Sequence, residues 1–484
     1  MESGQFDTAV IELRKATTLD PSLAEAYFNL GNALERRRDL DGAIRSYQEA
    51  IRLRPDWAEA HDALGVILGH RGNLLGARSE FETAVKLKPD GGEAHYHLGV
   101  ADWLRQDYST ALPELEDAAR LRPDDANAHY YLGLTYQQLG KTEAAIRELQ
   151  AAVQRLPVSA QFHNALGLAL QHDGDLVDAA AEFRRAAELK PEDVEPHNNL
   201  GLVLLAQGDG DGAIQEFRTA VRLDPKYSGA RNNLGLALLE KAQWEDAIRE
   251  YRALITLDPR DAEAYYNLGV ALKQKEDFDQ AVLALRQASE FDPTLPEPHY
   301  TQGVILWQQG KLDEAATEFR AAIRLRPGYA QAHSILGSVL RQKGDLEGAL
   351  DELHQAVALD ANDAAAHQSL GTVYRQKGDT AKAQEEFQKA ETLNKAQMNL
   401  QAATLTTNTG AKQLRNGDLE GAIEKFHAAL KLSPDFAAAH FQLALALRQK
   451  GDARQATEEF EKAYRLDPHL KPPQMSEKAA ARRP

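Results

Sequence analysis

The 484-residue sequence contains no cysteine. Disulfide bonds, thiolate metal sites and cysteine nucleophiles are therefore excluded, and the redox state of the compartment stays open. The first residues show no basic region followed by an apolar run, and no stretch of about eighteen apolar residues occurs. We therefore expect no membrane span and a cytoplasmic location, unless an upstream segment absent from this sequence carries a signal.

Basic residues are scarce relative to acidic ones. Lysine and arginine number 56 against 73 aspartates and glutamates, a formal net charge of −17. This charge opposes binding to nucleic acid and to anionic lipid, because phosphate groups are repelled. Hydrophobic residues make up 43% and charged residues 27%, as in a chain that folds around its own core. The alanine-rich composition, with arginine preferred to lysine, is typical of a bacterial protein.

Catalytic motifs are missing or out of context. The sequence has no G-x-S-x-G serine turn, no P-loop and no H-E-x-x-H zinc motif. Residues 208–213 match the G-x-G-x-x-A form of a dinucleotide fingerprint. That motif needs a preceding strand, and here it joins two predicted helices. We therefore predict no enzymatic activity, no cofactor and no metal site.

The sequence does contain a period of 34 residues, which marks a repeat architecture. Prolines, leucine-glycine pairs and alanines all follow it. The prolines are at positions 21, 55, 89, 123, 157, 191, 225, 259, 293 and 327. The leucine-glycine pairs begin at positions 30, 64, 98, 132, 166, 200, 234 and 268.

Each period is predicted to form two short amphipathic helices. Tyr27, Leu30 and Leu34 have helical spacing in the first helix, as do Ala43 and Tyr47 in the second. Glycine followed by Asn or Asp marks the turn, because glycine closes the first helix and Asn or Asp caps the second. The proline then ends the unit, since it cannot continue a helix interior.

Small residues at fixed places predict close helix crossings. We expect Gly31 and Ala43 to face each other within a pair of helices, and Ala50 to admit the next pair. A leucine at position 43 would overpack the contact at a cost of about 1 to 3 kcal/mol. Leu30→Ala would open a cavity that costs about 2 to 5 kcal/mol.

This pattern resembles the tetratricopeptide repeat (TPR), in which an aromatic residue, Leu-Gly, Ala, a second aromatic and Pro recur. The resemblance implies an all-α fold, a right-handed α-solenoid superhelix of helix-turn-helix units. Thirteen full units begin at Ala24, Ala58, Gly92, Ala126, Ala160, Val194, Ser228, Ala262, Pro296, Ala330, Ala364, Ala403 and Ala437.

The repeats divide the chain into five segments. Residues 1–23 form a half repeat with a second helix only, and residues 24–397 form eleven tandem units. The phase then slips, so that residues 398–402 are an insertion at a joint and residues 403–470 form two further units. Residues 471–484 are predicted to be a disordered tail. Because the half repeat lacks its partner helix, we expect an upstream segment, a truncated sequence or self-association at that end.

Nine of the fifteen histidines recur at one register of the first helix. Other units have an aromatic residue there, so we predict that these histidines pack toward the core. A second interpretation is that their protonation, near an unperturbed pKa of about 6.5, loosens the stack in acid. The nine are His61, His95, His129, His163, His197, His299, His333, His367 and His440.

In this family the first helices line a concave groove, so the resemblance places the peptide-binding residues on them. One or two residues before the leucine-glycine pairs stand asparagines, whose amides offer both donors and acceptors to a peptide backbone. They resemble the asparagine ladder in the repeat region of peptide O-linked N-acetylglucosamine transferases. The candidate amides are Asn29, Asn198, Asn199, Asn232, Asn233 and Asn267.

Aromatic residues on the same helices are predicted to supply apolar anchors for a ligand. They are Tyr96, Trp103, Tyr130, Tyr266, Tyr300 and Trp307. The lysine, asparagine and arginine set of repeat clamps that grip acidic chaperone tails is absent. Arginines toward the far end nevertheless favour acidic ligands. They are Arg341, Arg375, Arg415 and Arg448.

These patterns predict a protein-protein interaction scaffold or adaptor that binds extended peptide segments. Its expected partners are other proteins or peptides and not nucleic acid. Two alternatives remain open at this point. One is a separated substrate-recognition arm of a peptide glycosyltransferase, and the other is a homo-oligomeric structural element.

Overall fold

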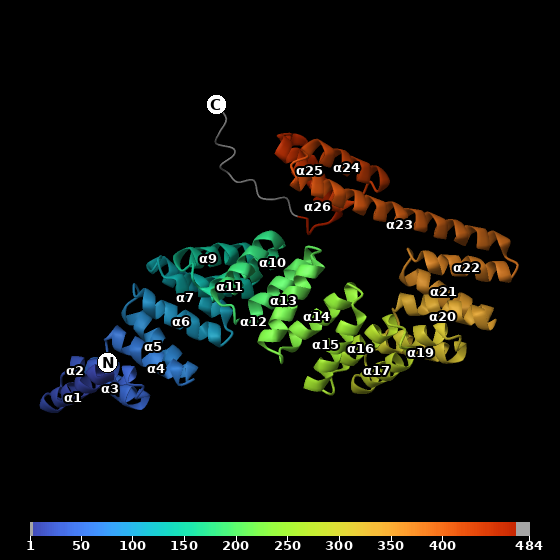
Figure 1. Cartoon of the computed structure of the whole chain (residues 1–484). Coiled ribbons are helices and arrows are strands. Elements are labelled where there is room, and N and C mark those ends of the chain that lie inside the picture. Colours follow the sequence, from blue (N-terminus) through green and yellow to red (C-terminus); the bar gives the residue numbers. More distant parts are fainter. Residues whose placement is uncertain (1–2, 471–484) are drawn as a thin grey trace. The chain divides into compact units, whose positions relative to one another are not determined.

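The computed structural model describes residues 3–470, and every regular element within them is a helix. The chain forms two compact units, residues 1–242 and 243–484. The first unit contains α1 (Ser3–Leu19), α2 (Ala24–Arg36), α3 (Leu40–Leu53), α4 (Ala58–His70), α5 (Leu74–Leu87), α6 (Gly92–Leu104), α7 (Tyr108–Leu121), α8 (Ala126–Gln138), α9 (Thr142–Arg155), α10 (Ala160–Asp173), α11 (Leu176–Leu189), α12 (Val194–Ala206), α13 (Gly210–Leu223) and α14 (Ser228–Glu240) (Figure 1).

The second unit contains α15 (Trp244–Leu257), α16 (Ala262–Gln274), α17 (Phe278–Phe291), α18 (Pro296–Gln308), α19 (Leu312–Leu325), α20 (Ala330–Lys343), α21 (Leu346–Leu359), α22 (Ala364–Gln376), α23 (Thr380–Arg415), α24 (Leu419–Leu432), α25 (Ala437–Lys450) and α26 (Ala453–Leu466). Within each unit, helices pair in chain order and each pair packs on the next. The prediction of an all-α solenoid of helix-turn-helix repeats is confirmed. The predicted disordered tail lies outside the described residues.

The turns between paired helices follow the predicted chemistry. Gly72 has φ +76°, a conformation that glycine adopts without steric cost. The side chain of Asn73 then accepts a hydrogen bond of 3.0 Å from the backbone N–H of Gly76. Asp345 caps α21 in the same way, by accepting from the N–H of Gly348 at 3.0 Å. These caps satisfy backbone donors that the first helical turn leaves unpaired.

The glycine of the leucine-glycine pair faces a large side chain of the second helix. The predicted contact between Gly31 and Ala43 stays a prediction, although at the same register a Cβ atom on Gly337 would lie 3.1 Å from the carbonyl oxygen of Ala349. A Cβ atom on Gly31 would lie 2.5 Å from Cε1 of Tyr47, whose side chain is fully buried. Gly201 has the same relation to Phe217, also at 2.5 Å. Glycine is needed here because a ring occupies the space of its missing side chain.

We predict that Gly167→Val lowers the free energy of unfolding by about 1 to 3 kcal/mol through overpacking. A Cβ atom at this position would lie 2.7 Å from Cε1 of Phe183. The measurement is urea denaturation followed by circular dichroism. Gly229→Val is the control, because the nearest atom to its Cβ would be 3.6 Å away, on Tyr227. Equal losses in the two variants would contradict the steric explanation.

The nine recurring histidines each bond a glutamate of the paired second helix, as the packing interpretation requires. Nδ1 of His163 lies 2.5 Å from Oε2 of Glu182, and Nε2 lies 3.1 Å from the carbonyl oxygen of Pro157. The carbonyl contact joins this helix to the end of the preceding repeat. The pairs are His61–Glu80, His95–Glu114, His129–Glu148, His163–Glu182, His197–Glu216, His299–Glu318, His333–Glu352, His367–Glu386 and His440–Glu459.

The chain does not turn at the predicted joint. α23 runs without a break from Thr380 to Arg415, and the predicted insertion at residues 398–402 lies inside it. At the other repeat boundaries of both units a short turn separates successive helices. Here Lys395 stands at the register of the proline, and the sequence contains no residue that stops the helix. The second helix of one repeat and the first helix of the next are therefore a single helix.

Candidate functional site

The candidate site is the row of fifth and sixth residues of the first helices, counted from the start of each repeat, which we call the first-helix face. The fifth residue of one repeat contacts the sixth residue of the next, 35 positions later. Nδ1 of His97 lies 2.8 Å from Oδ1 of Asp62 at this spacing. The rings of Tyr96 and Tyr131 meet edge to face at a centroid distance of 6.0 Å.

Asparagine side chains form a hydrogen-bonded amide chain across α10, α12 and α14. Nδ2 of Asn233 donates to Oδ1 of Asn198 at 2.9 Å, and Nδ2 of Asn199 donates to Oδ1 of Asn164 at 3.1 Å. A longer contact of 3.4 Å from Nδ2 of Asn198 to Oδ1 of Asn199 links the two. Three of the predicted amides are thus brought together, with Asn164 as a fourth member.

The remaining predicted amides are more dispersed. Asn29 is exposed on α2 and makes no side-chain hydrogen bond with any described residue. Asn232 is half-buried on α14, next to the amide chain. Asn267 belongs to the second unit and is buried on α16. The resemblance to a continuous transferase ladder therefore stays a prediction.

The predicted aromatic anchors of the first unit form a cluster on α6, α8 and α10. Trp103 meets Tyr131 edge to face at 5.5 Å, and Tyr130 stacks on Phe162 at 4.6 Å. Tyr130 is buried, so its ring packs between helices and does not face solvent. Tyr96 is partly exposed, and burial raises the pKa of its phenol to about 12. That phenol therefore remains a hydrogen-bond donor at neutral pH.

In the second unit, Tyr266 and Asn267 line one pocket of about 370 Å³. Glu263 and Glu297 also line it. Burial raises the pKa of Tyr266, which keeps its phenol protonated. The pocket offers a donor, an amide and carboxylates to a ligand.

The other two predicted anchors, both on α18, contact side chains in or directly before α20. Tyr300 stacks on Tyr329 at 5.0 Å. The indole N–H of Trp307 donates to Oε1 of Gln342 at 3.1 Å. Both side chains are partly exposed, so each can still contribute apolar area to a bound segment.

The part of the chain that the structure describes contains neither a metal-binding cluster nor a membrane-spanning helix. Between residues 3 and 470, no three histidine, aspartate or glutamate side chains are grouped to hold a metal ion. No helix in that range combines the length and apolar character needed to cross a bilayer. The polar groups described above are suited to hydrogen bonding.

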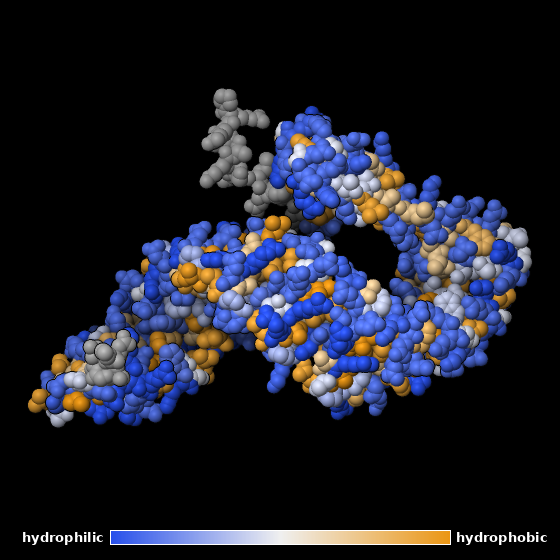
Figure 2. Space-filling model, in the orientation of Figure 1, coloured by the Kyte–Doolittle hydropathy of each residue, from blue (hydrophilic) through white to orange (hydrophobic). Residues whose placement is uncertain are grey.

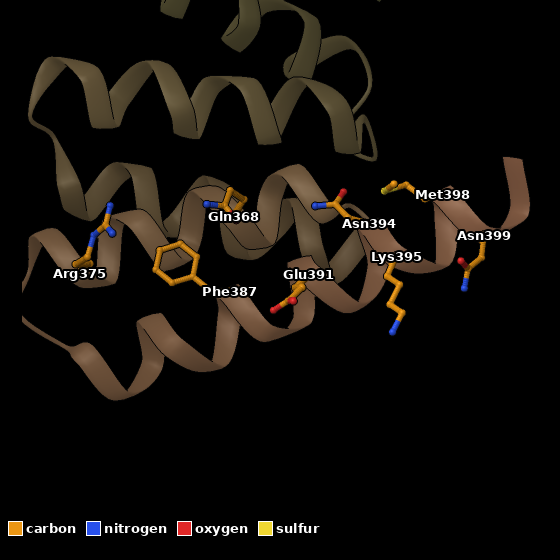
Figure 3. Close-up of a pocket in the computed structure, with 8 residues that line it drawn as sticks. All are labelled: Gln368, Arg375, Phe387, Glu391, Asn394, Lys395, Met398 and Asn399. Carbon is orange, nitrogen blue, oxygen red and sulfur yellow. The ribbon is translucent and has the colours of Figure 1, made fainter. Parts of the chain in front are cut away.

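Sequence reasoning missed two sets of residues. Asn164 and Tyr131 lie on the first-helix face, and their signal was the 35-residue spacing to a predicted residue. Phe162, which stacks on Tyr130, was also missed. A pocket at the joint, between α22 and α23, was also missed. Its lining includes Phe387 and Lys395 (Figure 3).

Family models of the tetratricopeptide repeat match most of the chain. The model described as "Tetratricopeptide repeat" matches residues 130–194, 300–364 and 412–470. A model described as "TPR repeat" matches residues 1–37, 104–140, 203–241 and 235–276. Three further tetratricopeptide models match residues 24–57, 262–295 and 364–397.

Several solved structures are similar to parts or to all of the chain. Residues 41 to the end of MamA from Desulfovibrio magneticus RS-1 are 30% identical, with coverage of 35% of this chain and 96% of that one and a TM-score of 0.33. YrrB, a TPR protein with an unusual peptide-binding site, is 26% identical, with coverage of 39% and 96% and a TM-score of 0.33. Yeast Tom70 is 18% identical, with coverage of 95% and 94% and a TM-score of 0.37. No curated protein matches the chain.

Proposed function

This chain belongs to the tetratricopeptide repeat family, and we propose on that basis that it is an interaction scaffold that holds an extended segment of a partner polypeptide on its first-helix face. The observation that carries the proposal is the amide chain from Asn164 to Asn233. The proposal assigns the chain no reaction of its own. The predicted self-association and the transferase-arm alternative stay predictions.

The amide chain suits a peptide backbone because its members are only partly satisfied. An asparagine side chain has two N–H donors and an oxygen with two lone pairs. Asn198 and Asn199 each donate one hydrogen bond and accept one within the chain. Asn199 is partly exposed and therefore keeps one donor and one lone pair for a ligand, whereas Asn198 is buried and orients its neighbours. Their mutual bonds fix the amide orientation before binding, which reduces the entropy lost on association.

Hydrogen bonds to backbone groups give affinity without strict sequence preference. If several contribute about 1 kcal/mol each and partly exposed rings such as Tyr96 add apolar contacts, an affinity in the micromolar range, about −8 kcal/mol, is reached. The scaffold would therefore accept related segments from different partners.

The test is the combined substitution Asn199→Ala and Asn233→Ala, with peptides selected from a random library on the unmodified chain. We expect binding to weaken by about 10- to 100-fold, since two or more hydrogen bonds are lost. The measurement is fluorescence anisotropy with the selected peptides. Urea denaturation of the same variant shows how much of the effect comes from weaker packing between repeats.

Gln215→Ala is the matched control, because Gln215 is an exposed amide on a second helix, α13, of the same unit. It is expected to bind the selected peptides normally. If the two-asparagine variant also binds them normally, the first-helix face is not the binding surface. A loss of affinity in the control alone would place the site on the second helices.

A further inference from the structure

The continuous helix α23 changes what packs on the preceding repeat. Elsewhere the chain turns after a second helix, and the next first helix folds back onto the pair, as α22 does after α21. α23 instead continues beyond Lys395, so the register of the next first helix begins only at Ala403. At about 1.5 Å per residue, this start lies about 12 Å further along the helix axis. The face of α22 and α23 that a following helix would cover is therefore left open.

Phe387 shows the consequence at the level of one side chain. It occupies the register of the large second-helix residue that meets the repeat glycine, and it packs on Gly371. Its counterparts Phe319, Leu353 and Phe426 are fully buried. Phe387 is partly exposed and lines a pocket of about 660 Å³. A core position is thus open to a ligand.

Beyond Phe387, most side chains of α23 at residues 394–400 are exposed. Residues 394–398 are all exposed, and Met398 has 70% of its surface accessible. Leu400 is also exposed, with 43% accessible. Figure 2 shows apolar patches along α23, as on other parts of the surface. Apolar side chains of this size on a helix without neighbours indicate a surface that a partner covers.

The polar residues of the pocket have no partners among the described residues. None of their side chains forms a hydrogen bond or an ion pair there, although Arg375 lies over the ring of Phe387 at 5.4 Å. Glu391 replaces the apolar residue that other repeats pack against the next helix, for example Ile323 and Val357. These polar side chains are Gln368, Arg375, Glu391, Asn394, Lys395 and Asn399.

The arrangement of the pocket selects a helix as its occupant. Phe387, Glu391, Lys395 and Met398 follow one another along one face of α23, and Arg375 reaches the same face from α22 (Figure 3). In the other repeats the equivalent face holds a first helix of 13 or 14 residues. An apolar side chain of an incoming helix can rest on Phe387 and Met398.

The charge of the pocket lining indicates what kind of partner helix it binds. Arg375 and Lys395 face the pocket with Glu391 as the single carboxylate, so the lining carries a net positive charge in a chain of net charge −17. A planar guanidinium is suited to bind a carboxylate through two hydrogen bonds. An acidic helix supplies that carboxylate, whereas a basic helix would leave both cations unpaired.

We propose that the pocket between α22 and α23 is a second binding site, which takes an amphipathic acidic helix of a partner protein in the place of the missing first helix. The apolar stripe of the partner covers Phe387 and Met398, and its carboxylates pair with Arg375 and Lys395. This site goes beyond the proposed first-helix face, because it recognises a folded helix and not an extended backbone.

The test uses the full chain and synthetic alanine-rich peptides of about four helical turns. The acidic probe carries leucines at three- and four-residue spacing flanked by glutamates, and a basic probe carries lysines in place of the glutamates. We expect the acidic probe to bind in the micromolar range and the basic probe at least about tenfold more weakly. Combined Arg375→Glu and Lys395→Glu should invert this preference, and Met398→Glu should weaken both probes.

Lys412→Glu is the control, because Lys412 is exposed on the same helix outside the pocket, and it should leave both affinities unchanged. No binding of the acidic probe at millimolar concentration overturns the proposal, as does equal affinity for the two probes. A dimer of the chain that Lys395→Glu abolishes, without probe binding, overturns it in favour of a second copy. Peptides selected for the first-helix face should still bind the pocket variants, which separates the two sites.

Discussion

Phe217→Ala is expected to lower the free energy of unfolding by about 3 to 5 kcal/mol, the largest effect of any single substitution considered. Phe217 is fully buried and its ring fills the space beside Gly201. Removal of the ring leaves a cavity between α12 and α13. The neighbouring repeats pack against both helices, so the two cannot move together to close the cavity. The glycine has no side chain with which to fill it.

Phe387→Ala provides a matched control for this prediction. Phe387 occupies the equivalent register and contacts Gly371 at a similar distance, but it is partly exposed. Its loss should therefore cost less, because less apolar area is removed from contact with the protein. Urea denaturation combined with amide hydrogen exchange reports both variants, since a solenoid can open repeat by repeat. An equal loss of unfolding free energy in the two variants would show that the burial of the Phe217 ring does not explain its contribution to stability.

Raising the pH through the folded-state pKa of His163 is expected to destabilise the packing of its helix pair. The hydrogen bond with Glu182 raises the pKa of His163, burial opposes the shift, and the carbonyl of Pro157 adds to it. A raised pKa in the folded state gives stability that is complete below the unfolded value of about 6.5 and is lost as the pH rises through the folded value. The interpretation that protonation loosens the stack is therefore wrong for His163.

Lowering the pH is expected to destabilise the chain by protonating glutamates of the histidine–glutamate pairs. Burial tends to raise the pKa of Glu386, but hydrogen bonds from Lys389 and His367 outweigh it and lower the pKa overall. Glu459 behaves in the same way with Lys462 and His440. Their stabilisation is complete above the unfolded value of about 4.5 and is lost as the pH falls through the folded value. The stabilising contributions of His163, Glu386 and Glu459 are therefore all complete between about pH 4.5 and 6.5.

The check is urea denaturation at pH 6 and pH 8.5 of the unmodified chain and of Glu182→Gln. The unmodified chain should unfold at lower urea concentration at pH 8.5. Glu182→Gln should show a smaller difference, because a neutral amide favours the protonated imidazole less than a carboxylate does. An identical pH dependence in both would contradict the role of this pair.

The fold could be predicted because the repeat constrains every level of structure. Prolines, glycines and apolar residues at a period of 34 agree on the same helix pairs, and the first helices begin where the repeats were expected to begin, except at Ala403 inside α23. The large side chain that meets each repeat glycine was not predicted, because spacing along the chain does not show every residue that meets across a crossing. The partner of Gly31 is Tyr47, 16 positions later.

The candidate site was less predictable. The amides could be found from their register, but the bond from Asn233 to Asn198 depends on how far successive first helices are displaced. The phase slip predicted a joint, yet not a continuous helix, because a missing proline permits a turn as well as a helix. Glu391 was a signal that could have been read, since it replaces an apolar residue at a register that other repeats bury.

The most direct test of the scaffold account is photo-crosslinking in living cells, with a photoreactive amino acid placed at Asn199 on the first-helix face or at Gln215 on a second helix. We predict covalent adducts with partner polypeptides from Asn199, and none above background from Gln215. Adducts of equal yield from both positions, or from Gln215 alone, would contradict the claim that partners are held on the first-helix face.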